Sequence, residues 1–486
     1  MTFSRRVPAD MQENALSEAR ARLQREGRSY IDLTESNPTR AQFVYPDDLL
    51  ASLADARGLA YRPEALGAFA ARQAVAADFT RRDIVVAPER IMLTVSTSEA
   101  YSLLFKLLCD PGDEVLIPQP SYPLFEHLTR LDSVVSVPYQ LEYHGRWSID
   151  MASVRRALTP RTRAVLLVNP NNPTGSFVST SELDALADVC VPRDLALIAD
   201  EVFSDYRLTD DVDGNIGVLA ARHDVLGFSL GGLSKSVGLP QVKLAWTAVT
   251  GPRVGVDAAL ARLELICDTY LSISTPVQLA VQNMLERGAD IRTQIRARIR
   301  RNHSQCASLV GERRSCTLLH AEGGWSAVIR VPHLIPEDDL VLSLLVESGV
   351  LVHPGYFFDF AEESYLVVSL LVPDVAFAEG LGACSIGAPL VIAREWNQAM
   401  RRARAPFLRA VVAKLGLRRD RRYRAAHRVV GRRGAACAST ATPERDGAGR
   451  LLAVFRHERH GVRSDLHQPA RRTRVRCRRW RRVALD

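Results

Sequence analysis

Short apolar runs that end in polar residues recur along the first half of the chain, with helical segments between them. Three such runs are IMLTV at 91–95, AVLLVNP at 164–170 and LALIAD at 195–200. Segments 98–109 and 180–190 have helical apolar spacing, and each begins with residues that favour a helix N-terminus. This alternation predicts an α/β fold with a mostly parallel sheet that is sandwiched by helices.

The pattern changes near residue 285, which predicts a second, smaller α/β domain. A long basic helical stretch at 285–315 leads into strand-like pieces such as GGWSAVIRVP and YLVVSLLVP. We therefore divide the chain where its pattern changes. The expected parts are an N-terminal arm with a loop (1–45), a large domain (46–285), a small domain (286–384) and a basic tail (385–486).

The net charge of +8 is unevenly distributed between the two ends of the chain. Residues 385–486 contain 27 Lys and Arg against 7 Asp and Glu, about +20, which leaves the first 384 residues near −12. The tail shows no sustained apolar period, so we predict that it is disordered. A solvated tail, or the product of an altered reading frame in Arg-rich coding sequence, is favoured over an arm that binds nucleic acid.

The composition excludes several classes of protein. A hydrophobic fraction of 47% and a charged fraction of 24% are ordinary for a soluble globular protein. We find no apolar run long enough to cross a bilayer and no apolar segment of a secretion signal near the N-terminus. The eight cysteines are scattered without a CxxC pair, which argues against a metal site or a disulfide framework. A cytoplasmic protein is expected.

The stretch GGLSKSVGLPQVKLAW, residues 231–246, places Lys235 among small residues and a second cation, Lys243, shortly after it. An amine in a small-residue pocket loses solvation, which favours its neutral, nucleophilic form. Most lysines in such loops are solvated, however. The motif therefore indicates a catalytic lysine only in combination with the polar residues at the ends of the predicted strands.

Two groups of polar residues follow predicted strands, where ligands of such sheets bind. Ser96, Thr97 and Ser98 begin a helix, and the N–H groups and hydroxyls at a helix N-terminus bind anions. Asp200 ends a strand, and a partly buried carboxylate needs a cationic partner. A protonated pyridine nitrogen would satisfy it; a helix cap or an internal salt bridge is the alternative.

Two further motifs place an amide and an aromatic ring near these groups. NPNNPTG (169–175) contains Asn172, whose amide both donates and accepts, and prolines that permit a cis peptide. Tyr122 lies between prolines, where a rigidly held ring can stack on a flat heterocycle. A strand-end turn and a core tyrosine are the alternatives.

The order of anion site, aromatic, Asn turn, aspartate and two lysines resembles the class I/II aminotransferases, fold type I enzymes that use pyridoxal 5′-phosphate (PLP). The resemblance covers roughly residues 30–380 and is most specific in NPNNPTG, DEVFSDY and SKSVGLPQVKLAW. It implies the PLP fold type I. It also implies an enzyme that transfers an amino group between an amino acid and a 2-oxo acid through a Schiff base on Lys235.

The resemblance implies roles for the other residues as well. Asp200 keeps the pyridine nitrogen protonated, and Asn172 bonds the 3-oxygen of the ring, near the substrate. Tyr61 reaches the phosphate in a neighbouring subunit, which implies a homodimer. Asn37, in the ESNPT segment, belongs to the loop that closes over the substrate. The remaining cofactor-binding residues implied are Ser96, Thr97, Ser98, Tyr122, Ser234 and Lys243.

Three positions depart from the family pattern. Phe203 stands where a tyrosine is frequent, so a hydrogen bond to the 3-oxygen is lost. Lys243 stands where the family usually has a phosphate-binding arginine. A lysine ammonium is a point charge, whereas a planar guanidinium can donate two parallel hydrogen bonds. The strand YLVVSLLVP lacks, at Val367–Ser369, the arginine that clamps the substrate carboxylate, so we consider Arg330 as its replacement.

Two alternative functions stay open. A PLP-dependent lyase of the carbon–sulfur β-lyase type uses the same fold. A PLP-binding regulator or nucleic-acid-binding protein would act through the basic tail. Such regulators carry a helix-turn-helix domain ahead of the PLP domain, whereas here the substrate-loop motif begins by about residue 35. We therefore expect an amino acid and a 2-oxo acid as partners, with neither nucleic acid nor membrane.

Overall fold

A computed structural model describes most of the first 384 residues. The described ranges are 3–8, 12–209, 216–312, 316–333, 335–362 and 364–384. All of them fall in one of the two units into which the chain divides. The tail predicted at 385–486 lies outside the described residues, so its predicted disorder stays a prediction.

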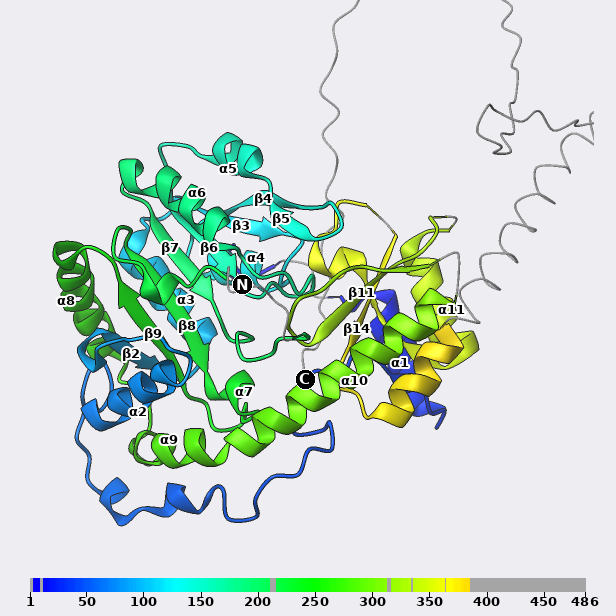
Figure 1. The fold of residues 1–486 in the computed structure, drawn as a ribbon, viewed down its shortest axis with the longest axis horizontal. Coiled ribbons are helices and arrows are strands. Elements are labelled where there is room, and N and C mark those ends of the chain that lie inside the picture. The colour runs from blue at the N-terminus through cyan, green and yellow to red at the C-terminus, as the bar shows by residue number, and fades with distance from the viewer. Residues whose placement is uncertain are drawn as a thin grey trace, which may run out of the picture. The chain divides into compact units, whose positions relative to one another are not determined.

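An eight-stranded sheet forms the centre of the described structure, in the order β2-β9-β8-β7-β6-β3-β4-β5 (Figure 1). Its strands are β2 (Ile91–Thr94), β3 (Glu114–Gln119), β4 (Val135–Tyr143), β5 (Trp147–Ile149), β6 (Thr162–Val168), β7 (Ala196–Asp200), β8 (Gly227–Gly232) and β9 (Ala245–Thr250). The five strands β8, β7, β6, β3 and β4 pair in parallel, which confirms the predicted mostly parallel sheet.

Strand β9 runs antiparallel to both of its neighbours, β8 and β2, and β5 runs antiparallel to β4. The pair Gly232↔Ala245 closes the end of β8 against the start of β9. The connection over residues 233–244 therefore leaves and re-enters the sheet at the carboxyl end of β8. Lys235 and Lys243 both lie on this connection.

Helices cover both faces of the large sheet because alternate strand residues point to opposite faces. In β6, Ala164 and Leu166 pack in one apolar cluster, while Val165 and Leu167 pack in another on the opposite face. Helices α3 and α8 line the first cluster, and α5 and α6 the second. The helices around this sheet are α2 (Phe69–Thr80), α3 (Thr97–Leu108), α4 (Phe125–Leu131), α5 (Met151–Ala157), α6 (Thr180–Cys190), α7 (Leu233–Ser236), α8 (Arg253–Tyr270) and α9 (Thr275–Arg287).

The predicted helices at 98–109 and 180–190 are present as α3 and α6, and each begins at a serine cap. Ser96 accepts a hydrogen bond from the Glu99 N–H. Ser179 and Glu182 form a reciprocal capping box that begins α6. The short 3-10 helices are η1 (Ala51–Ala54), η2 (Ala56–Leu59), η3 (Pro88–Arg90), η4 (Val191–Arg193), η5 (Leu219–Ala221) and η6 (Gly355–Phe358).

A four-stranded sheet, β10-β11-β14-β13, forms the centre of the smaller α/β part. Its strands are β10 (Thr317–Leu318), β11 (Ser326–Arg330), β13 (His353–Pro354) and β14 (Tyr365–Ser369). Helices α1 (Ala15–Arg25), α10 (Ala289–Gly311) and α11 (Glu337–Ser348) lie beside it, and β1 (Ile31–Asp32) pairs with β12 (Val350–Leu351) (Figure 1). Residues 374–384 are helical.

The stretch predicted as one long helix at 285–315 contains a break. Helix α9 ends at Arg287, and α10 begins at Ala289. At Gly288 between them, an added Cβ would lie 2.4 Å from Val237 Cγ1, which only a glycine avoids. The start of α10 therefore packs directly against the segment that follows Lys235.

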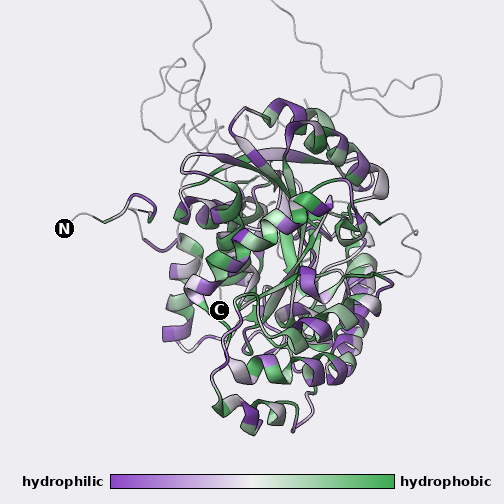
Figure 2. Cartoon of the chain, turned by 90° about the vertical axis from the view of Figure 1, so that its left-hand side faces the viewer, coloured by the Kyte–Doolittle hydropathy of each residue, from purple (hydrophilic) through white to green (hydrophobic). Residues whose placement is uncertain are grey.

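The hydropathy of the residues follows this layering. Figure 2 shows apolar residues concentrated on the central strands and polar residues on the outer surfaces of the helices. Within the described part of the chain, no helix is long and apolar enough to cross a membrane.

Candidate active site

Asp200 and Lys235 lie at the ends of adjacent strands. Asp200 is the last residue of β7, and Lys235 lies in α7, just after β8. Their side chains interact electrostatically; Asp200 is buried, and Lys235 is half-buried. The structure therefore places together the two residues on which the sequence interpretation depends.

The Asp200 carboxylate is fixed by hydrogen bonds from two other elements. Tyr101 Oη of α3 donates to Asp200 Oδ2 at 2.9 Å, and the Val202 N–H donates to Oδ1 at 3.2 Å. Burial raises the pKa of Asp200, although both hydrogen bonds and the Lys235 charge oppose this shift. The sequence analysis missed Tyr101 because its position fits the apolar face of a helix.

The Lys235 amine lies beside two adjoining aromatic rings. Its Nζ lies 5.6 Å from the centre of the Phe203 ring and 5.0 Å from that of Trp325. No described residue accepts a hydrogen bond from it. Burial lowers the pKa of Lys235 to about 8, while the Asp200 charge acts in the opposite direction. A larger fraction of the amine is therefore neutral, and nucleophilic, than for an ordinary lysine.

The NPNNPTG turn presents Asn172 toward the smaller sheet. Asn172 Oδ1 accepts a hydrogen bond from Ser326 Oγ of β11 at 3.3 Å. The peptide bonds before Pro170 and Pro173 are cis, as the sequence allowed. Asn171 holds the turn itself, because its amide bonds Thr174 Oγ1 at 2.9 Å and accepts from Ser121 Oγ at 2.9 Å.

Tyr122 lies beside the buried carboxylate. Burial and the charge of Asp200 raise the pKa of Tyr122 to about 12. The ring packs edge-on against Phe125 at 5.9 Å between centroids. The structure thus brings this predicted stacking residue to the site.

Ser96, Thr97 and Ser98 begin helix α3, whose later residue Tyr101 bonds Asp200. Ser96 caps the helix, and Thr97 and Ser98 form its first turn, where backbone N–H groups have no partner within the helix. This helix end is therefore an anion-binding position on the same element as the Asp200 contact.

Two of the residues predicted to bind the cofactor, Lys243 and Tyr61, are exposed. Lys243 adopts a left-handed backbone conformation with φ of 62° and forms no ion pair with the described residues. The Tyr61 side chain is 76% exposed and lines a shallow hollow with Tyr270 and Ser272. Within one chain, Tyr61 is thus available to a neighbour.

Comparison with known proteins identifies the family of this chain. Residues 28–374 match the aminotransferase class I and II family. The chain belongs to this family. The fold and the motif order had predicted this result. The aminotransferase is a PLP-dependent enzyme that moves an amino group between an amino acid and a 2-oxo acid.

Individual relatives support this assignment. An alanine aminotransferase from Mycobacterium tuberculosis is 29% identical over 364 residues, which are 71% of this chain and 82% of that one. The glutamate-pyruvate aminotransferase AlaA from Escherichia coli is 30% identical over 283 residues, 57% of this chain and 68% of that one.

Solved structures share the aminotransferase fold. An alanine aminotransferase from Pyrococcus furiosus has a TM-score of 0.72 at 21% identity, over 79% of this chain and 98% of that one. A Thermus thermophilus aspartate aminotransferase mutant has a TM-score of 0.69 at 24% identity, over 79% and 99%. None of these matches is to a lyase or a regulator.

Two predicted substrate residues lie in different surroundings. In the aminotransferase, Asn37 Oδ1 accepts hydrogen bonds from the N–H and Oγ1 of Thr39, which shape the ESNPT loop. Arg330 is exposed at the end of β11. It lies about 13 Å along the strand from Ser326, at ~3.3 Å per residue, so the structure does not bring it to Asn172.

The position that lacks an arginine belongs to an uncharged cross-strand row. Val367 of β14 pairs with Val328 of β11 on one side and with His353 of β13 on the other. Neighbouring strand residues Leu366 and Val368 point into the core, so the row occupies the opposite face, with Ser326. Val367 is only 1% exposed, and burial lowers the pKa of His353 to about 4. The row therefore carries no charge at neutral pH.

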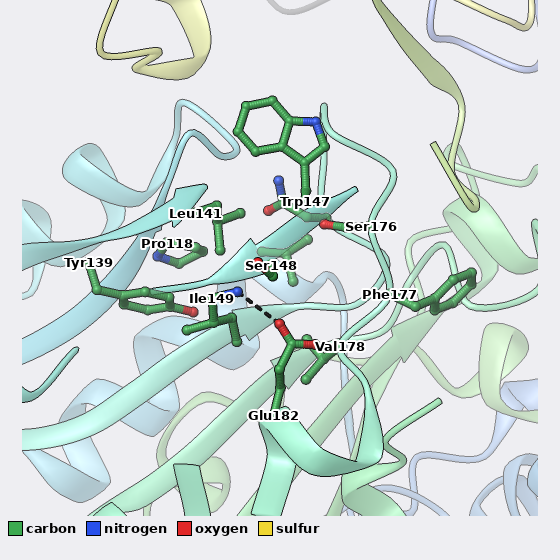
Figure 3. A pocket seen from close by; sticks show the side chains of 12 residues that line it. Pro118, Tyr139, Leu141, Trp147, Ser148, Ile149, Ser176, Phe177, Val178 and Glu182 are labelled. Atoms are coloured by element: carbon green, nitrogen blue, oxygen red, sulfur yellow. Dashed lines mark hydrogen bonds between the residues drawn. The ribbon is translucent and has the colours of Figure 1, made fainter. Parts of the chain in front are cut away.

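A small hollow lies beside the Asn turn, and its lining does not include Lys235 (Figure 3). Its lining includes Trp147, Phe177 and Glu182, whose Oε1 accepts a hydrogen bond from the Ile149 N–H at 2.8 Å. Its volume of about 10 Å³ suits a single water molecule. It is too small to be a cofactor site.

The residues around Lys235 fit PLP. The buried Asp200 forms no salt bridge with the described residues, and the amine has no competing acceptor among them. The N-terminus of α3 and the unpaired Lys243 supply two groups that attract a phosphate dianion.

Proposed function

We propose that Lys235 bonds covalently to the aldehyde carbon of PLP and that Asp200 holds the proton on its ring nitrogen. The observation that carries this proposal is the desolvated Lys235 amine, without a hydrogen-bond acceptor among the described residues, beside the buried Asp200 at the ends of two adjacent parallel strands. Such an arrangement supplies a nucleophilic amine and a carboxylate that requires a proton donor.

The remaining predicted residues would hold the cofactor around this pair. Ser96, Thr97 and Ser98 would bind its phosphate through the N-terminus of α3, together with Ser234 and Lys243. Tyr122 would stack on the ring. Asn172 would bond the 3-oxygen, and Phe203 would leave that oxygen without a phenol partner.

The chemistry divides between the cofactor and the chain. PLP supplies a ring that accepts the electrons released when the substrate Cα loses its proton. Lys235 Nζ would take that proton from Cα and later release it, since its lowered pKa suits both directions near neutral pH. Phe203 and Trp325 would keep water from the amine. Asn172 and Asn37 would orient the substrate.

The enzyme would act as a homodimer in the cytoplasm. Several large apolar side chains are exposed in one chain, among them Leu59 at 93% and Leu265 at 73%. With Tyr61 and Tyr270 they would be covered by a second copy, and Tyr61 would then complete the phosphate site of that copy. The large domain would span 46–285 and the small domain 286–384.

Alanine, glutamate and aspartate are the proposed amino donors, with pyruvate and 2-oxoglutarate as acceptors. Support comes from the names of the relatives, which include alanine, glutamate-pyruvate and aspartate/prephenate aminotransferases. Because the cross-strand row carries no charge, we expect the enzyme to select for a carboxylate on its substrate less strongly than it would with an arginine in that row.

The test is covalent trapping of the cofactor. Borohydride makes a bond between a lysine amine and the PLP aldehyde permanent, and peptide mass spectrometry then locates it. We expect the label at Lys235, no label in Lys235→Ala, and 2-oxo-acid-dependent amino transfer by the unmodified enzyme. A label on another lysine, or release of ammonia without transfer, would contradict the proposal.

A further inference from the structure

Side chains from outside α7 bind the backbone on which Lys235 stands. Tyr206 Oη donates to the carbonyl oxygen of Lys235 and, at 3.2 Å, to that of Ser236. Arg292 Nε of α10 donates to the same Ser236 oxygen at 3.0 Å. Helix α7 is a single short turn, so its own hydrogen bonds fix its direction poorly.

Arg292 is itself held in a buried ionic cluster. Its guanidinium lies 3.5 Å from Asp78 Oδ1 and 3.4 Å from Asp205 Oδ2, and Arg81 bridges the same two carboxylates at 3.0 and 2.8 Å. The side chains of Arg292, Asp78 and Asp205 are 5%, 7% and 6% exposed. With two positive and two negative charges, the cluster leaves no buried charge unpaired, which a stable site of this kind requires.

The packing of α10 places Arg292 at the required position. Gly288 lets the start of the helix contact Val237, the residue after Ser236. Arg292 follows about one turn later on the same helix, and α2 and the segment after β7 supply its two carboxylate partners. Three elements therefore fix one guanidinium against the carbonyl of Ser236.

Tyr206 also packs against Trp325, one of the rings beside the Lys235 side chain. Its ring packs edge-on against Trp325, with 5.1 Å between centroids, and Trp325 lies 5.0 Å from Lys235 Nζ. Phe203, the other ring beside the amine, also contacts Trp325, with 5.2 Å between centroids. Tyr206 therefore binds the Lys235 backbone and supports the aromatic wall beside the amine.

We propose that Arg292 and Tyr206 are positioning residues, which fix the backbone of residues 235–236 so that the Lys235 amine stays against the adjacent rings of Phe203 and Trp325. The inference rests on the proposed role of Lys235. It assigns no contact with substrate or cofactor to either residue. They act through the carbonyl groups that they bind.

The experiment compares Arg292→Met and Tyr206→Phe with a control, Asn302→Leu, in the full chain loaded with PLP. Asn302 lies on the same helix and is fully buried, and its Nδ2 also donates to two backbone carbonyls, of Leu370 at 2.9 Å and Val372 at 2.7 Å. Neither carbonyl belongs to α7. The control therefore measures the loss of comparable hydrogen bonds without removing one to the backbone of Lys235 or Ser236.

We expect Arg292→Met and Tyr206→Phe to lower kcat by roughly tenfold or more, with KM within about twofold of the unmodified enzyme. Visible circular dichroism per bound PLP, which reports how rigidly the protein orients the cofactor, should fall in both variants. In Asn302→Leu we expect a lower melting temperature, with kcat and the circular dichroism unchanged. Tyr206→Phe leaves the buried charges intact. If Arg292→Met does not fold, the kcat and circular dichroism of Tyr206→Phe alone test the proposal.

The inference is overturned if Tyr206→Phe keeps the kcat and the circular dichroism of the unmodified enzyme. It is equally overturned if Asn302→Leu loses both to the same extent, since the effect would then reflect general loss of stability. Failure of the proposed function looks different: borohydride trapping of the unmodified enzyme would then leave Lys235 unlabelled.

Discussion

The two sides of the site differ in how their chemistry is encoded. On the cofactor side, polar and ionisable groups stand at strand and helix ends: Asp200, Lys235 and the first turn of α3. On the opposite side, the cross-strand row of Val328, Val367 and His353 is uncharged. The contrast indicates that the ionisable groups of the described site gather at the strand and helix ends of the large sheet, while the row offers no ionic contact.

The largest expected effect comes from removing the carboxylate on the cofactor side. In Asp200→Asn we expect kcat to fall roughly a hundred- to a thousandfold, because an amide does not hold the ring nitrogen protonated. Steady-state kinetics at saturating substrate would measure it, with far-ultraviolet circular dichroism to confirm folding. A loss below about tenfold would mean that the contrast between the two sides is wrong.

Next in size is the hydrogen bond that supports this carboxylate. Tyr101→Phe should lower the free energy of unfolding by about 1.5–3 kcal/mol, since the bond is to a charged, buried group. Tyr139→Phe is the matched control, because Tyr139 is also buried and donates to the neutral Leu166 carbonyl at 2.9 Å. There we expect about 1 kcal/mol. Urea unfolding would compare them, and equal losses would argue for a neutral Asp200.

On the opposite side, Val367→Ala should affect stability and substrate affinity before it affects chemistry. Loss of two buried methyl groups should cost roughly 2 kcal/mol of unfolding free energy. We expect KM for the amino acid to change more than kcat. A kcat loss as large as that of Asp200→Asn would show that the row takes part in the reaction itself.

The smallest effect concerns pH. Because only the neutral Lys235 amine attacks, the rate of covalent PLP attachment to cofactor-free protein should rise with pH, be half-maximal near 8 and then level off. The Asp200 charge raises the pKa of Lys235, so Asp200→Asn should move this midpoint to lower pH. Stopped-flow absorbance would measure both, and a midpoint near the ordinary lysine value would show that the amine is solvated.

The sequence predicted those features of the fold and the site that depend on local residue patterns. Polar residues that end apolar runs identified Asp200, Asn172 and the start of α3, because strand ends of parallel sheets gather at one edge. The reversed direction of β9 was not predictable, since an apolar run has no direction. Roles that depend on tertiary contacts were missed as well.

Tyr101, Trp325 and Arg292 show why such contacts escape sequence analysis. Tyr101 matches the apolar spacing of its own helix, and Trp325 belongs to a strand-like segment of the other sheet. Arg292 lies in a helix rich in arginines, where nothing local distinguishes a buried guanidinium from its solvated neighbours. Only the fold separates them.

The reversed direction of β9 has a consequence for how this enzyme can change. Because β9 returns beside β8, one connector carries both Lys235 and Lys243. An insertion or deletion between the two lysines would change their spacing. In their proposed roles at the two ends of the coenzyme, the lysines could be retuned separately only by point substitution, because the length of this connector sets the distance between them.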